Sequence, residues 1–505
     1  MAADNAAVEQ AGRGDKLILA KCAALGRPQV HDPFDLPART KETMSNETRE
    51  QQIEEILAGL QIAAECSQSY LRERDSRKVY PDQAGLGSLA QFHEPFPEQS
   101  STANKVLTML DKFGSPATVN STGGRYFGFV IGGTLPACLG ASWLANTWDQ
   151  NAAFRVMSPV AAELEEVVLR WVCDILRLPA DCAGGLVTCA TTANFTALAA
   201  ARHALLGRVG WNVAEDGIFG APPIDVVVGE EVHASMRKAL NLVGFGQKRV
   251  TTVPVDAQGR MLADKLPRLN SNTILCIQAG NVNSGSFDPA VELCERAREY
   301  GAWVHVDGAF GLWAAASPKH GHLVNGFEMA DSWATDAHKW PNVNYDSGIV
   351  LVRDGVALQA AMHISAAYLE PDQRREPTNQ TPEASRRARA IELWAGLKSL
   401  GRQGLADLIE RTCAYAQRFA AGLCEAGYEI LNEVVINQVL VSFGSAEKTR
   451  EVTRRVQEDG TCWCGGTVWQ GRAAMRISVS SWATTKQDVE ESLAAIVRIA
   501  REVTV

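Results

Sequence analysis

The chain has 505 residues, of which 46% are hydrophobic and 21% charged, enough to bury a large core split over two or three domains. Its 49 Lys and Arg against 58 Asp and Glu give a formal net charge of −9, which disfavours a nucleic-acid partner and an anionic membrane surface. Twelve cysteines are too few for a disulfide scaffold, and with no basic and apolar leader after Met1 they predict a cytoplasmic protein with reduced thiols.

The first part of the chain predicts helices. Residues 1–46 mix Ala, Gly, Pro and charge with little periodicity and are expected to form a flexible extension. Residues 47–74 carry a roughly helical apolar stripe, which predicts an N-terminal helical arm within a segment at 47–120. Residues 126–148 are uncharged, but Gly132, Gly133 and Pro136 interrupt them, which favours a buried pocket wall over a membrane span. Residues 161–176 form a helix with one apolar face.

Short apolar runs then alternate with helical segments. The runs are residues 185–189, 224–228, 250–253, 274–278, 303–307, 332–335 and 349–352. Continuous apolar runs separated by helices predict a mainly parallel sheet covered on both faces, within a large domain at residues 121–370. Ligands of such sheets bind beyond the carboxyl ends of the strands, so polar residues that end the runs are candidates for a site.

The last part of the chain predicts a smaller α/β domain at residues 371–505. It holds a long helix at 385–426, apolar runs at 439–443 and 475–479, a charged helix at 448–457 and a last helix from Lys486. Cys462-Trp463-Cys464 is a C-x-C pair without further ligands at a recognisable spacing, so we expect a strand or turn there and no metal.

Two residues at strand ends indicate a pyridoxal phosphate site. Lys339 follows the run that ends at Thr335, where partial burial would leave an amine able to form a Schiff base with an aldehyde. Asp307 ends the run 303–307 and could keep a pyridine nitrogen protonated. Taken alone, each has an ordinary alternative, because a Lys after a strand is commonly a surface residue and an Asp there commonly caps a helix.

Two further segments add to this pattern. Residues 188–194, Thr-Cys-Ala-Thr-Thr-Ala-Asn, join a strand to a helix and could offer N–H and hydroxyl groups to a phosphate at the helix N-terminus; an ordinary cap is the alternative. His233 follows another strand and could stack on a cofactor ring, or be a structural histidine.

In order, these segments resemble the group II pyridoxal-phosphate-dependent amino-acid decarboxylases, the family of aromatic amino-acid, histidine and glutamate decarboxylases. The resemblance runs collinearly from about residue 47 to 500, through Arg77–Asp82, His305-Val-Asp-Gly-Ala309, 322–332 and Ala337-His-Lys-Trp340 to Arg476. It implies an α/β enzyme of the aspartate-aminotransferase type (fold type I). It also implies a homodimer with active sites at the subunit interface.

The resemblance implies roles for matching residues. Lys339 would hold pyridoxal 5'-phosphate, Asp307 would pair with its ring nitrogen, and His233 and Ala309 would lie on opposite ring faces. The phosphate would bind Ala190, Thr191 and His338, and Asn281 would replace a threonine near a cofactor oxygen. Arg476 would meet a substrate carboxylate, with a salt bridge in the small domain as the alternative.

The reaction implied is loss of the α-carboxylate of an L-amino acid as carbon dioxide, leaving an amine. Arg125, Tyr126, Phe127, Trp148 and Phe154 would line the substrate entrance, although the aromatic residues also suit a core. The rings favour an apolar substrate, whereas Arg125 and Arg155 could hold a second carboxylate, so both substrate classes stay open.

One departure from the family concerns the proton donor. Relatives carry a loop tyrosine after the lysine that helps to protonate Cα, and phenylalanine there goes with aldehyde-forming relatives. Residues 369–386 contain neither, so His233, Tyr368, a dimer partner or water would supply the proton, or the product is not the simple amine. The alternatives to a decarboxylase are an oxygen-using aldehyde-forming enzyme, an aminotransferase and a catalytically silent scaffold.

Overall fold

The protein is represented by a computed structural model that describes residues 41–363 and 374–504. Tyr368 and most of the expected extension at residues 1–46 lie outside the described residues. The chain divides into two compact units: Met1–Gln68 with Pro95–Asp111, and Ser69–Glu94 with Lys112–Val505.

The first unit contains most of two helices, α3 (Lys41–Glu73) and α5 (Ala103–Gly114). They pack closely at Gly59, where an added Cβ would lie 3.7 Å from Leu107 and 3.8 Å from Ala103. Ile53 and Ile56 of α3 are exposed. The predicted N-terminal helical arm is therefore present.

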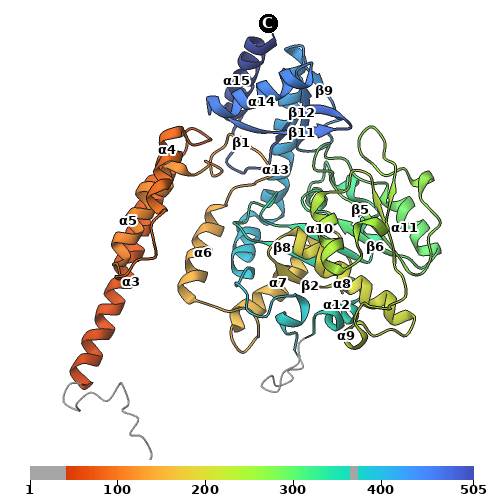
Figure 1. Cartoon of the computed structure of the whole chain (residues 1–505), viewed down its shortest axis with the longest axis horizontal. Helices are drawn as coiled ribbons and strands as arrows, with labels where there is room; N and C mark the ends of the chain where they lie inside the picture. The colour runs from red at the N-terminus through yellow and green to blue at the C-terminus, as the bar shows by residue number, and fades with distance from the viewer. Residues whose placement is uncertain (1–40, 364–373, 505) are drawn as a thin grey trace, which may run out of the picture. The chain divides into compact units, whose positions relative to one another are not determined.

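The second unit is built on a seven-stranded sheet with the order β2-β8-β7-β6-β5-β3-β4. Figure 1 labels β2, β5, β6 and β8 of this sheet. All strands run parallel except β8, which is antiparallel to both of its neighbours. The strands are β2 (Ala183–Val187), β3 (Asp225–Gly229), β4 (Val250–Val253), β5 (Thr273–Gln278), β6 (Trp303–Asp307), β7 (Ser332–Asp336) and β8 (Gly348–Val352). Each of the seven apolar runs forms one of these strands, which confirms the predicted sheet.

Helices cover both faces of this sheet because each strand is apolar on both sides. One face packs against α8 (Ala190–Arg208), α10 (Ala234–Val243) and α12 (Gly355–Met362). The other packs against α7 (Pro159–Ile175), α11 (Ala290–Glu299) and α13 (Ala390–Glu425), which breaks at Gly401. Two short helices lie in connecting segments of this unit. They are α4 (Gln83–Ser88), which precedes α5 in the sequence, and α9 (Val213–Asp216), between α8 and β3.

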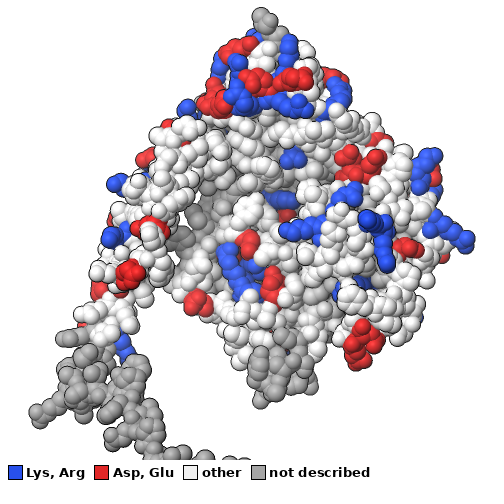
Figure 2. All heavy atoms as spheres, viewed as in Figure 1, with Lys and Arg blue, Asp and Glu red and all other residues white. Residues whose placement is uncertain are grey.

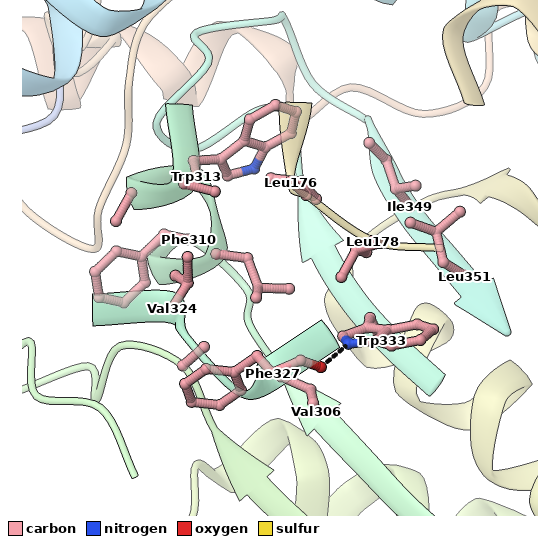
Figure 3. Close-up of a cluster of buried hydrophobic side chains, with 14 of the residues drawn as sticks. Leu176, Leu178, Val306, Phe310, Trp313, Val324, Phe327, Trp333, Ile349 and Leu351 are labelled. Carbon is pink, nitrogen blue, oxygen red and sulfur yellow. Dashed lines mark hydrogen bonds between the residues drawn. The ribbon is translucent and has the colours of Figure 1, made fainter. Parts of the chain in front are cut away.

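Large aromatic side chains fill the second of these faces. Figure 3 shows Phe310, Trp313, Phe327 and Trp333 packed against aliphatic side chains from the strands. The Trp333 indole N–H donates to the Phe327 carbonyl oxygen at 2.8 Å, so its polar atom is satisfied in the core. This packing makes the sheet a rigid platform for residues at its carboxyl edge.

The C-terminal part forms a five-stranded sheet with the order β1-β11-β12-β10-β9. Its elements are β1 (Tyr126–Phe127), β9 (Glu429–Ile430), β10 (Gln438–Ser442), β11 (Trp463–Trp469), β12 (Arg472–Ser478), α14 (Ala446–Asp459) and α15 (Lys486–Thr504). Figure 2 shows charges of both signs interspersed at the top of the view, where Figure 1 labels α14 and α15. In these two helices Arg454 pairs with Glu451 and Glu458, and Arg498 with Asp459. The predicted α/β elements of the C-terminal part are therefore present, with β1 from residues 126–127 added to their sheet, and Cys464 lies in β11.

The uncharged stretch at residues 126–148, expected to form a buried pocket wall, contains a short strand and a helix. It forms β1 and the helix α6 (Pro136–Trp148), while Gly132 lies against the backbone of Lys339. No helix in the described part of the chain is long and apolar enough to cross a membrane.

Candidate active site

The site lies at the carboxyl ends of β6 and β7, which are neighbouring parallel strands. Asp307 ends β6 and Asp336 ends β7, and both are buried. Lys339 follows β7 by three residues, and its Nζ lies 3.2 Å from Asp336 Oδ2. The predicted lysine and aspartate are thus at the same edge of the sheet, as parallel strands require.

The turn that carries Lys339 is held by Asn342. This residue is buried and adopts a positive φ of 59°, a conformation that asparagine tolerates better than most residues. Its side-chain amide donates to the Trp340 carbonyl oxygen at 2.6 Å and the Ser480 carbonyl oxygen at 2.9 Å, and its Oδ1 accepts from the Trp482 N–H. These bonds tie the lysine turn to the chain that follows β12.

Gly132 closes the turn from the other side. A Cβ added there would lie 2.0 Å from the Lys339 carbonyl oxygen and 2.7 Å from Asn342 Nδ2. The close approach therefore requires glycine.

Two N–H groups donate to the Asp307 carboxylate. Asn194 Nδ2 donates to Oδ2 at 3.3 Å, and the Ala309 amide donates to Oδ1 at 3.3 Å. Ala309 lies two residues beyond the strand, so its position is fixed by the same turn that presents the aspartate.

His233 lies within the electrostatic influence of the predicted site residues. It caps α10, and its Nδ1 accepts from the Ser235 amide at 3.2 Å, which places a neutral ring's proton on Nε2. Burial lowers the pKa of His233, and the positive charges of Lys339 and Arg476 lower it further, against the opposing effects of Asp307 and Asp336.

The N-terminus of α8 points to an anion site. The helix has no side-chain cap, and the Ala190 amide donates to Asp336 Oδ1 at 2.6 Å. Within residues 41–363 and 374–504, no protein group accepts a hydrogen bond from the amides of Thr191 and Thr192. Such N–H groups at the positive end of a 19-residue helix suit a phosphate.

His338 lies on the same side as this helix end. Its Nδ1 accepts from the Ser347 amide at 3.1 Å, and its Nε2 lies 3.6 Å from Asp336 Oδ2. Its ring packs on Tyr345 with centroids 4.3 Å apart. Burial lowers the pKa of His338, so the neutral ring with its proton on Nε2 is favoured.

Asn281 has both ends of its side chain engaged by protein groups. Its Oδ1 accepts from the amides of Asn283 and Ser284, and its Nδ2 donates to Gln278 Oε1 at 3.2 Å and the Glu231 carbonyl oxygen at 3.4 Å. It is therefore held as a turn residue beyond β5.

The three predicted arginines differ in their partners. Arg125 pairs with Glu491, and Arg155 with Glu163 and Glu166. Arg476 instead donates to the Val282 carbonyl oxygen at 3.2 Å and Asn283 Oδ1 at 3.4 Å, and burial lowers its pKa. Among the described residues no carboxylate lies within ion-pair distance of Arg476, which weighs against the alternative of a small-domain salt bridge.

The aromatic residues expected at the entrance have different environments. Tyr126 stacks on Trp463, with ring centroids 5.1 Å apart, and burial raises its pKa to about 12. Phe127 packs edge-on against Phe419 in the core of the small domain. Trp148 at the end of α6 is exposed in the single chain.

The residues present fit pyridoxal phosphate. A lysine amine, a buried carboxylate and two unpartnered helix amides match its aldehyde, ring nitrogen and phosphate. For a metal, by contrast, no group of three or more His, Cys, Asp or Glu side chains with suitable geometry occurs among the described residues.

Comparison with known proteins agrees with this fit. The sequence model of one protein family, described as the pyridoxal-dependent decarboxylase conserved domain, matches residues 88–444. The chain belongs to the pyridoxal-dependent decarboxylase family. It is a pyridoxal-phosphate-dependent amino-acid decarboxylase with a fold of type I.

Individual relatives cover most of the chain. An aromatic-L-amino-acid decarboxylase of Drosophila lebanonensis is 29% identical over 384 residues, 70% of this chain and 90% of that protein. A phenylacetaldehyde synthase of Arabidopsis thaliana is 26% identical over 375 residues, 67% of this chain and 74% of that protein. The crystal structure of Oryza sativa TDC with PLP and tryptamine superposes with a TM-score of 0.83 at 22% identity, covering 90% of this chain and 99% of that one.

Sequence reasoning assigned no role to three residues of this site: Asp336, Asn194 and His305. Asp336 carries the same signal as Asp307, because it is the polar residue that ends a buried strand. His305 alternates with Asp307 on β6, so both point to the same face. Asn194 carries no such signal, since both of its partners lie on β6, 111 and 113 residues away in the sequence.

Proposed function

We propose that this decarboxylase acts on an aromatic L-amino acid and that Lys339 holds its pyridoxal phosphate. Asp307 would face the ring nitrogen, His233 would cover one ring face, and the amides at the start of α8 would bind the phosphate. The observation that carries the proposal is the placement of Lys339 and Asp307 on neighbouring strand ends, where both charges act on His233.

In the reaction, the bond between Cα and the carboxylate breaks, carbon dioxide leaves, and a proton bonds to Cα in its place. Pyridoxal phosphate supplies an electron sink for the bonding pair. Asp307 is held by two N–H donors and can keep a ring nitrogen protonated. His233 presents its Nε2–H as a donor, since Nδ1 is occupied by the Ser235 amide.

Arg476 is the proposed partner of the substrate carboxylate. It is a half-buried arginine with two neutral acceptors, Val282 O and Asn283 Oδ1, and it has no carboxylate partner among the described residues. Its positive charge lowers the pKa of His233, which supports a place for Arg476 near the proposed site.

Two observations favour an aromatic over an acidic substrate. Arg125 and Arg155, the candidates for binding a second carboxylate, are already paired with glutamates. Tyr126, Trp463 and Phe129 form a stacked aromatic group that would suit a ring. The aromatic-L-amino-acid decarboxylase relative supports the same substrate class.

The second candidate is an aldehyde-forming enzyme, favoured by the absence of the family's loop tyrosine from residues 369–386 and by the similarity to a phenylacetaldehyde synthase. That reaction consumes oxygen and water with the amino acid and yields aldehyde, carbon dioxide, ammonia and hydrogen peroxide. The simple amine is the proposed product.

We also propose that the protein is a cytoplasmic homodimer. The helix α6 exposes Leu139, Trp143, Leu144 and Trp148 in the single chain, an apolar surface that a second copy would cover. The eleven described cysteines are all free, which suits a reducing compartment.

The test is to incubate the holoenzyme with each common amino acid and to measure carbon dioxide, amine, aldehyde, peroxide and keto acid. Amine and carbon dioxide in equal amounts from tryptophan, tyrosine or phenylalanine are expected. Keto acid without carbon dioxide contradicts decarboxylation, and aldehyde with peroxide favours the second candidate. Lys339→Ala should abolish the visible absorption of the bound cofactor.

A further inference from the structure

A buried chain of hydrogen bonds leads to Asp307 from the interior of the large domain. Trp303 Nε1 lies 2.9 Å from Ser332 Oγ, Ser332 Oγ lies 2.9 Å from His305 Nδ1, and His305 Nε2 lies 2.9 Å from Asn194 Oδ1. Asn194 Nδ2 then reaches Asp307 Oδ2 at 3.3 Å. We call these five residues the Asp307 relay; Asn194, His305 and Ser332 are fully buried.

The sheet explains why these side chains meet. Trp303, His305 and Asp307 alternate along β6, so they point to one face. Ser332 is the β7 residue in register with His305. Asn194 lies in α8, the helix that covers this face, one turn beyond the helix N-terminus.

The direction of every bond in the relay is determined. The Asp307 carboxylate can only accept, so Asn194 donates through Nδ2 and turns its Oδ1 toward His305. His305 must therefore carry a proton on Nε2. Burial lowers the pKa of His305 to about 4, so the ring is neutral at pH 7, and its Nδ1 accepts from the Ser332 hydroxyl.

Trp303 completes the relay at its inner end. Its indole N–H can only donate, and it donates to Ser332 Oγ. All four hydrogen bonds thus run in the same direction and end on the carboxylate. Hydrogen bonds arranged in this way polarise one another.

We propose that His305 and Asn194 are positioning residues that aim the Asp307 carboxylate at the cofactor's ring nitrogen, an inference that rests on the proposed function. Asp307 has one oxygen bound by Asn194 and the other by the Ala309 amide, which fixes the plane of the carboxylate. With this plane fixed, the carboxylate lone pairs that accept no protein hydrogen bond are held in one direction, toward the proposed position of the ring nitrogen. Neither His305 nor Asn194 needs to touch the cofactor for this.

The test compares two cofactors on the full-length chain after its cofactor has been removed: pyridoxal phosphate and its 1-deaza analogue, in which C–H replaces the ring nitrogen. We define the ratio as the dissociation constant of the 1-deaza analogue divided by that of pyridoxal phosphate. A larger ratio means a stronger contact between Asp307 and the ring nitrogen. Asn194→Leu and His305→Phe should each lower this ratio roughly 10- to 100-fold, the range for a hydrogen bond to a charged group. His305→Gln keeps an N–H that can reach Asn194 and should restore most of it.

Thr196→Val is the matched control. Thr196 is in the same helix, equally buried, and its hydroxyl bonds only the Thr192 carbonyl oxygen. It should change stability but leave the ratio at the wild-type value. A wild-type ratio in both Asn194→Leu and His305→Phe contradicts the proposal, because a merely structural relay weakens both cofactors alike.

Two further outcomes are distinguishable. Should Asn194→Leu fail to fold, Asn194→Asp keeps the side-chain shape but replaces the donating amide with an acceptor; a wild-type ratio at pH 8 then contradicts the relay. If the wild-type chain forms no visible-absorbing complex with pyridoxal phosphate, the proposed function itself fails. If it does form one, an unchanged ratio in the variants overturns the relay alone.

Discussion

The Asp336 carboxylate contacts both the lysine amine and the start of a helix. Its Oδ2 lies 3.2 Å from Lys339 Nζ, and its Oδ1 accepts from the Ala190 amide. The first N–H group of α8 therefore already donates to a carboxylate, beside the amides proposed to bind the phosphate. Two anions at one helix end repel each other, although the helix end attracts each of them.

Asp336→Asn should therefore strengthen cofactor binding. The asparagine oxygen can still accept from Ala190, while the negative charge beside the phosphate is lost. We expect roughly tenfold tighter binding of pyridoxal phosphate, a modest share of what a like charge nearby can cost. Titration of the cofactor-free chain measures this change; weaker binding would mean that the carboxylate holds Lys339 in place more than it repels the phosphate.

Gly132→Ala should displace the lysine turn. The added methyl group would meet the Lys339 carbonyl oxygen at 2.0 Å, so the turn or the segment before α6 must move. A displacement of about 1 Å at a reacting group lowers kcat/KM on the order of 100-fold. Gly207→Ala near the end of α8 is the control, since nothing lies within 4 Å of its added Cβ, and its activity should match the wild type. Equal activity in both variants contradicts the expectation.

His305 should make the cofactor-free protein less stable in acid. Its pKa is about 4 when folded and about 6.5 when unfolded, so between these values the unfolded chain binds a proton that the folded chain does not. Stability is thus lost as the pH falls from 6.5 to 4, by about 3 kcal/mol in all. His305→Gln removes this contribution.

The measurement is urea denaturation of the wild type and His305→Gln at pH 7 and pH 5. Asp288 acts in the opposite direction, because burial raises its pKa to about 6 and its protonation in the folded state favours folding as the pH falls. Asp288 is common to both proteins, so its effect cancels in the comparison. Parallel stability curves would show that His305 does not titrate as expected.

The sequence predicts the parts of this protein that depend on local pattern. Apolar runs such as 250–253 and 303–307 coincide with β4 and β6, because strands buried on both faces are continuously apolar. Only a strand or turn at residues 462–464 was predicted for β11, because Gly465 and Gly466 interrupt its pattern, and β1 was missed because two residues carry no period. α6 was missed because its exposed side is apolar, without the polar face that marks a surface helix.

The site is less predictable where its partners are distant in sequence. Lys339 and Asp307 were predicted from their places at strand ends, and the structure puts both at the same edge of the sheet. The pairing of Arg125 with Glu491, 366 residues away, removes a cation from the expected substrate entrance, and nothing near Arg125 predicts it. Asn194 meets Asp307 and His305 only through the packing of α8 on the sheet.

Leu144→Glu should break the proposed homodimer. It is one of four large apolar residues of α6 that are between 38% and 52% exposed in the single chain. A buried charge there should raise the dimer dissociation constant at least about 100-fold. Sedimentation measures the oligomeric state, with Leu242→Glu as the control at another exposed leucine, on α10. A wild-type chain that sediments as a monomer contradicts the proposal directly.

Arg476→Gln should weaken binding of the substrate carboxylate. The wild-type guanidinium is half-buried with two neutral acceptors, so a carboxylate entering the site would gain a charge-assisted hydrogen bond. We expect kcat/KM for the amino acid to fall on the order of 100-fold, the size typical of losing one side of a buried charged pair.

A carboxylate-free ligand separates this role from a general distortion of the site. The amine product lacks the group that Arg476 is proposed to bind, so its inhibition constant should be the same in Arg476→Gln and the wild type. Arg472→Gln is the control on the same strand, where the arginine is exposed and pairs with Glu429. If the amine and the amino acid lose affinity equally in Arg476→Gln, the arginine shapes the site through Val282 and Asn283 and does not bind the carboxylate.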